Sequence, residues 1–485
     1  MGLSTRRDFV RQAAMAALCC GGAVRGGSEA WMRSGEHGPR ASIDADALRK
    51  LSGKVQGRVI TQEAPDYDAA RTIFNKAFDL RPGVIVRCAS SSDVQRALEF
   101  AETASLELSV RAGGHSRLGY GMCDGGVALD FSAMRRVDVD AGKRTGRAQA
   151  GSLVRDLDEA TARYGLATTS GGCPTVGVAG FTLGGGEGRL MNKYGAACDN
   201  LRSAEVVTVD GRVVVASEES NPDLFWAIRG GGGNFGVVTA LEYRVHPVGE
   251  VLSGALVYES DRLPELLQAF ARFVESASDE MNAFAQIVPS RERARLQIDV
   301  CHCGEPGEGR ELIAPLRTLK PQSDSVRVMS YLEAQAAGGF LLKPVAHYQT
   351  NLFLRDLGGS AISALATAVQ HAPAGCKLIL VPLGGAVSRV KVSEMAFALR
   401  QPGFEIDIAG VWNSPEEKAD VVRWVESTRD RLRPLAQGAY VNQLGDTSDQ
   451  LVRLCYGENY ARLVELKKRY DPKNVLRRNQ NIKPA

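Results

Sequence analysis

Two glycine-rich stretches between Arg111 and Asn200 constrain the fold of this chain more than any other feature. The first begins at Arg111 and reads RAGGHSRLGYG; the second begins at Gly171 and reads GGCPTVGVAGFTLGGGEGRLMNKYGAACDN. Glycine has no Cβ, so its backbone adopts positive φ readily and its N–H groups can approach a bulky anion closely. Each stretch also carries one nucleophilic side chain, His115 or Cys173. Together they predict two loops that grip a phosphate-bearing cofactor.

The size and charge of the chain set the outer bounds of what it can be. With 485 residues it is too long for one ordinary core, so two domains are expected. A net charge of +3, with lysine and arginine scattered among nearly as many acids, predicts no nucleic-acid face. The expected partner is therefore a small molecule.

The first 30 residues have the pattern of a targeting segment. Arg6 and Arg7 stand two residues before Phe9, and a mildly apolar stretch follows over residues 13–24. That stretch is too short for a membrane span. The pattern is similar to a twin-arginine export signal, and the alternative is a weakly basic tail. The signal predicts passage through the twin-arginine export machinery and a periplasmic or extracellular location.

The cysteines give no sign of a disulfide framework or a metal site. Ten cysteines are present without regular spacing, and the pair Cys301 and Cys303 lacks the second pair that a zinc site needs. No metal is expected.

The pattern of expected strands and helices changes twice along the sequence. Short strand and helix patterns alternate over residues 45–248, and longer two-faced strands alternate with amphipathic helices over residues 249–438. The last stretch, 439–485, has a basic helix and an extended end, too little for a domain of its own. The expected fold class is therefore α+β, with two domains and a C-terminal segment that packs back on the first.

A dinucleotide fingerprint is the simplest alternative interpretation of the glycines. Such a site needs a strand, the glycines and then a helix, with an acid about 20 residues further on. The run over 184–188 leads into RLMNKYG, and the run over 231–236 leads directly into a strand pattern. Neither context fits, so Rossmann-type binding is not expected.

Four long motifs resemble those of a known family, in the same order. They are RAGGHS, CPTVGVAGFTLGGGEGRLMNKYGAACDN, NPDLFWAIRGGGGNFGVVT and YGENYARLVELKKRYDPKNVL. The chain resembles the FAD-linked oxidases of the berberine bridge enzyme type, within the vanillyl-alcohol oxidase/p-cresol methylhydroxylase superfamily. The resemblance implies a two-part FAD-binding domain of the p-cresol methylhydroxylase type over 45–248. It also implies a substrate domain on an antiparallel sheet over 249–438, with 439–485 returning to the FAD domain.

The resemblance also implies that FAD is attached at two points. His115 matches the residue that bonds the methyl group of the flavin ring, and Cys173 matches the residue that bonds the adjacent ring carbon. A neutral imidazole and a thiolate are suitable nucleophiles for this chemistry. The alternatives are an ordinary loop histidine and an inert thiol. Further cofactor contacts are expected from Arg111, Gly113, Gly114, Ser116, Val178, Gly180, Gly184, Gly236, Val238 and Asn479, with Gln480 beside the last.

The catalytic base departs from the family pattern. Many relatives place it on the second tyrosine of a Tyr-x-Asn-Tyr segment, where this chain has Tyr440-Val441-Asn442-Gln443. Glutamine is no base at neutral pH. Glu405 and Asp407 lie two apart in an expected strand over 404–413 and so share one face. Burial in the cleft would make either a base, whereas at least one is expected at the surface. Tyr440 is the third candidate.

The activity expected from the resemblance is hydride removal from an alcohol carbon of a sugar or secondary metabolite, with oxygen as acceptor and hydrogen peroxide as product. In the family, the residue three places after the flavin-linked cysteine influences oxygen access, and here it is Val176, which is small. Two alternatives stay open: a dehydrogenase with another acceptor, and a flavin-bearing binding protein without turnover, which Gln443 favours.

Overall fold

Short buried strands form the sheet that carries the first glycine loop. The computed structural model describes residues 43–289, 293–337, 343–446 and 448–484. In the first sheet the order is β1-β2-β4-β3, with β4 parallel to both its neighbours. Its strands are β1 (Arg58–Thr61), β2 (Val84–Arg87), β3 (Leu108–Arg111) and β4 (Val127–Asp130). The first glycine loop starts where β3 ends, at Arg111.

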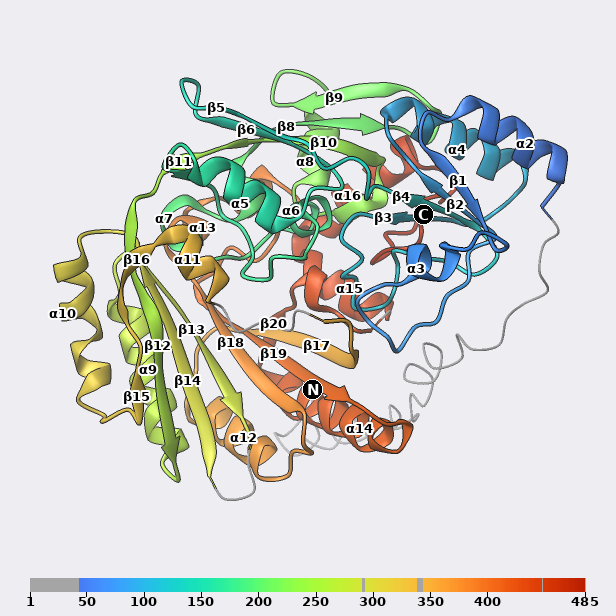
Figure 1. Ribbon diagram of the computed structural model, residues 1–485. Helices are drawn as coiled ribbons and strands as arrows, with labels where there is room; N and C mark the ends of the chain where they lie inside the picture. The colour runs from blue at the N-terminus through green and yellow to red at the C-terminus, as the bar shows by residue number, and fades with distance from the viewer. Residues whose placement is uncertain (1–42, 290–292, 338–342, 447, 485) are drawn as a thin grey trace, which may run out of the picture.

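A second, antiparallel sheet lies beside the first (Figure 1) and has the order β5-β6-β10-β8-β9. Its strands are β5 (Val137–Asp140), β6 (Thr145–Gln149), β8 (Leu201–Val207), β9 (Val213–Ser217) and β10 (Val237–Arg244). The helices of this half are α2 (Ala45–Lys54), α3 (Tyr67–Arg71), α4 (Ser91–Thr103), α5 (Val154–Ala162), α6 (Val178–Leu183), α7 (Met191–Tyr194) and α8 (Pro222–Ile228). The small pair β7 (Leu166–Ala167) and β11 (His246–Pro247) closes it. The second glycine loop runs from β7 into α6 and α7.

The third sheet is long and antiparallel, in the order β15-β12-β14-β13-β18-β19-β17-β20, with β16 also paired to β12. Its strands are β12 (Glu250–Ser260), β13 (Met281–Val288), β14 (Ala294–His302), β15 (Ser323–Asp324), β16 (Arg327–Ser330), β17 (Ala346–Leu354), β18 (Cys376–Leu383), β19 (Gly403–Trp412) and β20 (Ala436–Gly438). One face packs on helices α9 (Leu263–Ser276), α10 (Pro306–Arg317), α12 (Gly359–Gln370) and α14 (Pro415–Leu432). The two-faced strand patterns of the sequence predict this arrangement.

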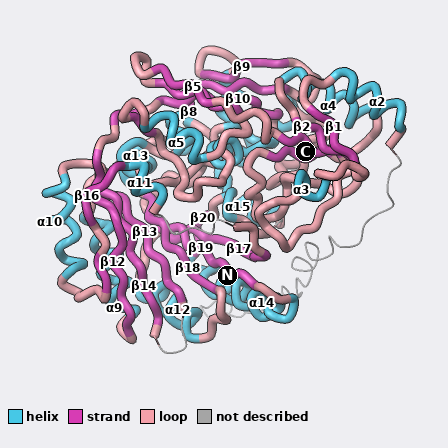
Figure 2. Tube along the Cα trace, in the orientation of Figure 1, coloured by secondary structure: helices cyan, strands magenta, loops and turns pink. Residues whose placement is uncertain are grey.

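The opposite face of this third sheet is turned toward the first half of the molecule, as the tube view shows (Figure 2). Side chains alternate between the faces of a strand. Ile406 and Ile408 of β19 therefore join the apolar core under the helices, while Glu405, Asp407 and Ala409 point the other way. Two short helices, α11 (Tyr331–Ala336) and α13 (Gly385–Arg389), lie where the two halves meet.

The C-terminal segment packs on the first half. It holds α15 (Asp449–Tyr456) and α16 (Tyr460–Tyr470), and apolar residues from both helices join the core formed by the first two sheets. A buried lysine fixes the tail: Lys467 Nζ donates to the carbonyl oxygen of Asn234 at 3.0 Å and to Asp471 Oδ2 at 2.7 Å. The α+β class and the antiparallel third sheet expected from the sequence are confirmed.

The chain crosses between the halves once more. Residues around α13 lie inside the range expected for the substrate domain, yet Met395 and Phe397 join the core of the first half. A buried ion pair fixes this crossing, with Arg400 Nη2 2.7 Å from Asp199 Oδ1. The boundary between the domains is therefore not a single cut in the sequence.

Within the described ranges, no helix combines the length and the apolar composition of a membrane span, and no cluster of His, Cys, Asp and Glu could hold a metal ion. None of the eight cysteines in these ranges forms a disulfide. The segment expected to be an export signal lies outside the described residues.

Replacing Lys467 with methionine tests the anchor of the C-terminal segment. The change leaves the Asp471 carboxylate buried without its charged partner, so the free energy of unfolding should fall by about 3–5 kcal/mol. Lys468→Met is the matched control, because Lys468 is the next residue and is exposed; it should change stability by less than about 0.5 kcal/mol. Urea unfolding followed by fluorescence measures both, and equal losses would contradict this role for Lys467.

Candidate active site

The two glycine loops touch backbone to backbone. A Cβ added to Gly113 would lie 2.2 Å from the Gly177 nitrogen, and one added to Gly177 would lie 2.4 Å from the Gly113 nitrogen. Neither distance is compatible with a side chain, so both positions need glycine. This contact holds the loop after β3 against the loop before α6.

The contact brings His115 and Cys173 to the same hydroxyl group. Thr175 Oγ1 lies 3.0 Å from His115 Nε2 and 3.4 Å from Cys173 Sγ. Phe74 stacks on the imidazole with 4.0 Å between ring centroids. Burial, and then the nearby Arg117 guanidinium, lower the pKa of His115 to about 4. The imidazole is therefore neutral at pH 7 and keeps a lone pair.

One cavity of about 480 Å³ runs along both loops and the open face of the third sheet. Of the residues predicted to bind the cofactor, its wall includes His115, Cys173, Arg111, Gly113, Gly114, Ser116, Gly180, Gly236, Val238 and Asn479. Val178 and Gly184 lie outside the wall. Val178 is buried in the core, and a Cβ on Gly184 would meet Asn442 Oδ1 at 2.1 Å, so this glycine accommodates a protein side chain.

The wall suits a ligand that carries phosphates and a polar ring. A Cβ on Gly180 or Gly233 would meet nothing within 4 Å, so their backbones face open space. Among the buried polar atoms of this wall that have no hydrogen-bond partner in the described residues are Arg111 Nε, Arg478 Nε, Asn479 Oδ1 and Gln480 Oε1. The exposed glycine backbone suits the phosphates of FAD, and the unpartnered donors and acceptors suit its polar rings.

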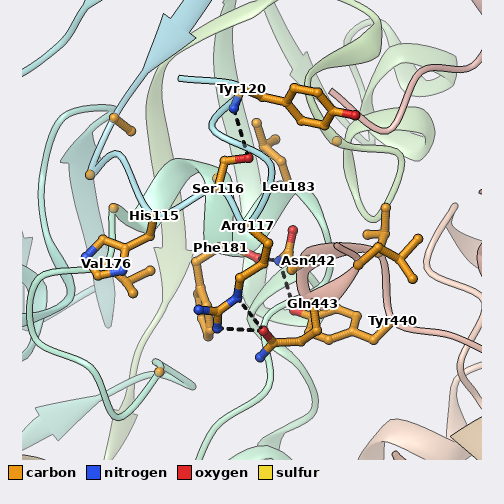
Figure 3. A pocket seen from close by; sticks show the side chains of 18 of the residues that line it. His115, Ser116, Arg117, Tyr120, Val176, Phe181, Leu183, Tyr440, Asn442 and Gln443 are labelled. Atoms are coloured by element: carbon orange, nitrogen blue, oxygen red, sulfur yellow. Dashed lines mark hydrogen bonds between the residues drawn. The ribbon is translucent and has the colours of Figure 1, made fainter. Parts of the chain in front are cut away.

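Tyr440 is held as a hydrogen-bond acceptor. Its hydroxyl accepts from the Gly186 N–H at 2.8 Å and from Asn442 Nδ2 at 2.9 Å. Burial raises the pKa of Tyr440 well above 10. The phenol therefore keeps its proton at neutral pH and is a poor base. Asn442 also donates to the Phe181 carbonyl at 2.9 Å, which ties this segment to α6 (Figure 3).

Gln443 is an acceptor for a buried cation. Its Oε1 accepts from Arg117 Nε at 2.9 Å and Arg117 Nη2 at 2.6 Å, as Figure 3 shows, and from Gln349 Nε2 at 2.9 Å. Arg117 lies two residues after His115, within the first glycine loop. The side chain that replaces the family's tyrosine thus fixes a guanidinium over the open face of the third sheet.

Two carboxyl groups of β19, Glu405 and Asp407, interact electrostatically with this guanidinium, and a third, Glu187 of the second glycine loop, interacts with both of them. Glu405 and Asp407 are 0% and 3% exposed, so the expectation that at least one lies at the surface is wrong; their strand face is turned into the molecule. Burial raises the pKa of Glu187 to about 7 and that of Asp407 to about 6, where Arg117 opposes the rise. Burial and the carboxyl of Glu187 raise the pKa of Glu405 well above its usual range.

The three acids therefore differ in protonation. Glu405 keeps its proton at neutral pH, because burial and the neighbouring carboxyls of Glu187 and Asp407 raise its pKa. Asp407 and Glu187 line the cavity, whereas Glu405 lies behind the wall. Asp407 is the carboxyl that is ionised at pH 7, faces the cavity and lies near Arg117. It is the best base among the predicted candidates.

Comparison with known proteins agrees with this geometry. Residues 82–217 match the FAD binding domain family, and residues 439–483 match the family described as berberine and berberine like. The chain is 32% identical to (R)-6-hydroxynicotine oxidase of Paenarthrobacter nicotinovorans, over 89% of this chain and 97% of that one. It belongs to the berberine bridge enzyme-like family. Like its relatives, it is an FAD-dependent oxidoreductase of the vanillyl-alcohol oxidase/p-cresol methylhydroxylase superfamily.

Two further relatives show the same extent of similarity. The crystal structure of 6-hydroxy-D-nicotine oxidase from Arthrobacter nicotinovorans superposes with a TM-score of 0.82 at 29% identity, over 90% of this chain and 99% of that one. Chitooligosaccharide oxidase of Gibberella zeae is 26% identical, over 85% of this chain and 89% of that one. Both domains of this berberine bridge enzyme-like protein therefore have counterparts in its relatives.

Sequence reasoning missed several polar residues of the site. Thr175 and Glu187 lie inside the quoted glycine motif, and Arg117 inside the first loop, so their positions were available as a signal. Gln349 and Lys377 come from β17 and β18, and no local pattern marks either. They enter the wall because their strands flank β19.

Glu187 should make stability depend on pH. Its pKa is higher in the folded chain than in the unfolded one, so its contribution to stability is present at low pH and is lost as the pH rises through about 7. Between pH 5 and pH 8, Glu187→Gln should lose less stability than the wild type. Thermal unfolding at intervals of half a pH unit measures this. Glu465→Gln, at a site 70% exposed, is the control and should follow the wild type; a Glu187→Gln curve parallel to the wild type would contradict the assignment.

Proposed function

We propose that this protein is an exported FAD-linked oxidase that removes a hydride from an alcohol carbon of a sugar or secondary metabolite and uses oxygen as acceptor, giving hydrogen peroxide. The observation that carries the proposal is one continuous cavity. At one side His115 and Cys173 meet at Thr175, and at the other Asp407 faces the same space beside Arg117.

FAD is proposed to be attached through both His115 and Cys173. Thr175 engages His115 Nε2, which leaves Nδ1 as the nitrogen available for a bond to the flavin ring. The low pKa of the imidazole favours attack, because the neutral ring needs no deprotonation. When bound, FAD supplies the hydride acceptor, and attachment at two points raises its potential. The glycine backbones and the unpartnered polar atoms of the wall hold its remaining parts.

Asp407 is proposed to accept the proton of the substrate hydroxyl. A general base works best with a pKa near the working pH, and that of Asp407 is about 6. Arg117 favours its ionised form, and Gln443 holds Arg117 in place. Glu405, which keeps its proton, adds no second negative charge beside the carboxylate. In this mechanism Gln443 is a positioning residue for Arg117. If a tyrosine were the base, Arg117 would not be needed to keep Asp407 ionised.

The substrate class and the acceptor rest on similarity and on the size of one side chain. A relative is named chitooligosaccharide oxidase, which supports a sugar alcohol as donor. Val176 lines the cavity three residues after Cys173, and its small side chain leaves room for oxygen. Arg6 and Arg7 support export by the twin-arginine route to a periplasmic or extracellular location. A dehydrogenase with another acceptor and a flavin-bearing protein without turnover are the alternatives.

Attachment at two points predicts a simple result for single and double variants. After acid precipitation, the wild type, His115→Ala and Cys173→Ala should each retain one flavin, because one bond is enough to hold it. His115→Ala/Cys173→Ala should release all its flavin to the supernatant. Intact mass and the visible spectrum of the pellet measure this. Release of flavin from the wild type would reject the covalent attachment.

Asp407 as base predicts both a rate loss and a change in the pH profile. In the wild type kcat/KM should rise with pH through about 6, because the base must be deprotonated. Asp407→Asn should lower kcat about 10²- to 10⁴-fold and remove this limb. Glu405→Gln is the control; its amide is neutral, like the protonated carboxyl that it replaces, so most activity should remain.

The assay measures flavin reduction and peroxide separately, with sugars and aromatic alcohols as donors. Reduction without peroxide would identify the dehydrogenase. A loss in Glu405→Gln that exceeds the loss in Asp407→Asn would move the role of base to Glu405.

A further inference from the structure

A row of side chains crosses three strands on the cavity face of the third sheet. In the register of the sheet, Lys377 of β18 is paired with Ala409 of β19, and Ala409 is paired with Gln349 of β17. Paired residues of neighbouring strands point to the same face. Lys377 and Gln349 therefore stand on either side of the small Ala409, and all three line the cavity.

The cation at each end of this row is without a carboxylate partner. Among the described residues, Lys377 has neither an ion pair within 4.0 Å nor a hydrogen bond. Arg117 reaches the other end through Gln443, which also binds Gln349; its Nε and Nη2 donate to that neutral amide, and it has no ion pair in the described chain. Two cations thus face one cavity, and between Lys377 and Gln349 the sheet leaves a gap above the methyl group of Ala409.

The nearby acids do not balance these charges. Asp407 is the one acid that interacts electrostatically with both Arg117 and Lys377. Glu405 keeps its proton, and Glu187 interacts with the two β19 carboxyls. The histidines beside Arg117, His115 and His347, are neutral at pH 7. Burial and then Arg117 lower the pKa of Lys377, and Asp407 opposes this, so an added anion beside Lys377 would stabilise its charged form.

We propose that Lys377 and Arg117 bind a carboxylate group of the substrate, so that the protein oxidises hydroxy acids such as sugar acids. The inference rests on the proposed function, because it names the substrate class for the same site. An anion in this gap would accept charge-assisted hydrogen bonds from both side chains. Ala409 leaves the space that the carboxylate needs.

The register also limits where the substrate is oxidised. Asp407 is paired with Ile379, two residues along from Lys377 in β18, so Asp407 and Lys377 are diagonal neighbours on one face. Diagonal neighbours in antiparallel strands are about 7–8 Å apart. A carboxylate on Lys377 therefore places a hydroxyl only a few bonds away within reach of Asp407, as in a 2- or 3-hydroxy acid.

Binding can be tested without turnover. The flavin-loaded protein is titrated with acetate and benzoate, and with the neutral isosteres acetamide and benzamide, while the visible flavin band is recorded. The acids should perturb the band and bind at least about tenfold more tightly than the amides, as expected for a charge-assisted contact. Lys377→Met should abolish this preference, Lys377→Arg should restore it, and the exposed control Lys468→Met should behave as wild type.

Turnover of matched pairs tests the substrate class. Mandelate is compared with mandelamide, and gluconate with glucose. The acids should have the higher kcat/KM, and Lys377→Met should remove the advantage mainly by raising KM about 10- to 100-fold. Equal binding of acids and amides by the wild type, or an unchanged preference in Lys377→Met, would overturn the proposal. A change in flavin reduction potential in Lys377→Met without loss of acid preference would overturn it too, because the lysine would then serve the flavin.

The two proposals fail separately. If acids bind with a preference that depends on Lys377 but no alcohol reduces the flavin, the anion site stands and the oxidase function fails. If neutral alcohols are oxidised and no acid is preferred, the oxidase function stands and the anion site fails.

Discussion

The contact between Gly113 and Gly177 is the constraint on which the rest of the site depends. Any side chain at either position would push apart two loops whose backbones are within van der Waals distance. Because the loops meet there, Thr175 reaches both His115 and Cys173, and the imidazole is buried enough to stay neutral. The glycines thus have two uses: some leave backbone open toward the cavity, and others let protein segments approach each other.

A second constraint is the cost of burying charge. Arg117 donates its hydrogen bonds to a neutral amide, Gln443, and not to a carboxylate. Its positive charge is therefore not neutralised by a direct partner, and it lowers the pKa of Asp407. Glu405 adjusts by keeping its proton. The chain lacks the second tyrosine of the family's Tyr-x-Asn-Tyr pattern. In the same cavity it has a carboxylate, Asp407, whose pKa is lowered by a guanidinium. Lys377 adds the second cation on which the proposed acidic substrate depends.

The prediction of the fold succeeded because the long motifs and the two strand textures are local properties of the chain. Alternation along 404–413 correctly placed Glu405 and Asp407 on one face of a strand. It could not say what that face met, because the first half of the molecule covers it, and so one acid was wrongly expected at the surface. Val178 and Gly184 lie in the predicted loop but outside the cavity wall. The motif alone does not show which of its residues face the ligand and which, like Gly184, pack against Asn442.

The sequence by itself determined the α+β fold, the family, the FAD cofactor and the two loops that carry His115 and Cys173, because each is encoded in contiguous residues. Only the tertiary structure decided which groups share the cavity. Arg117, Gln349, Lys377 and Gln443 come from four separate segments, and the pairing of strands far apart in the sequence brings them together. Protonation followed from the same packing, because burial and neighbouring charge, not residue type, set the pKa of each carboxyl.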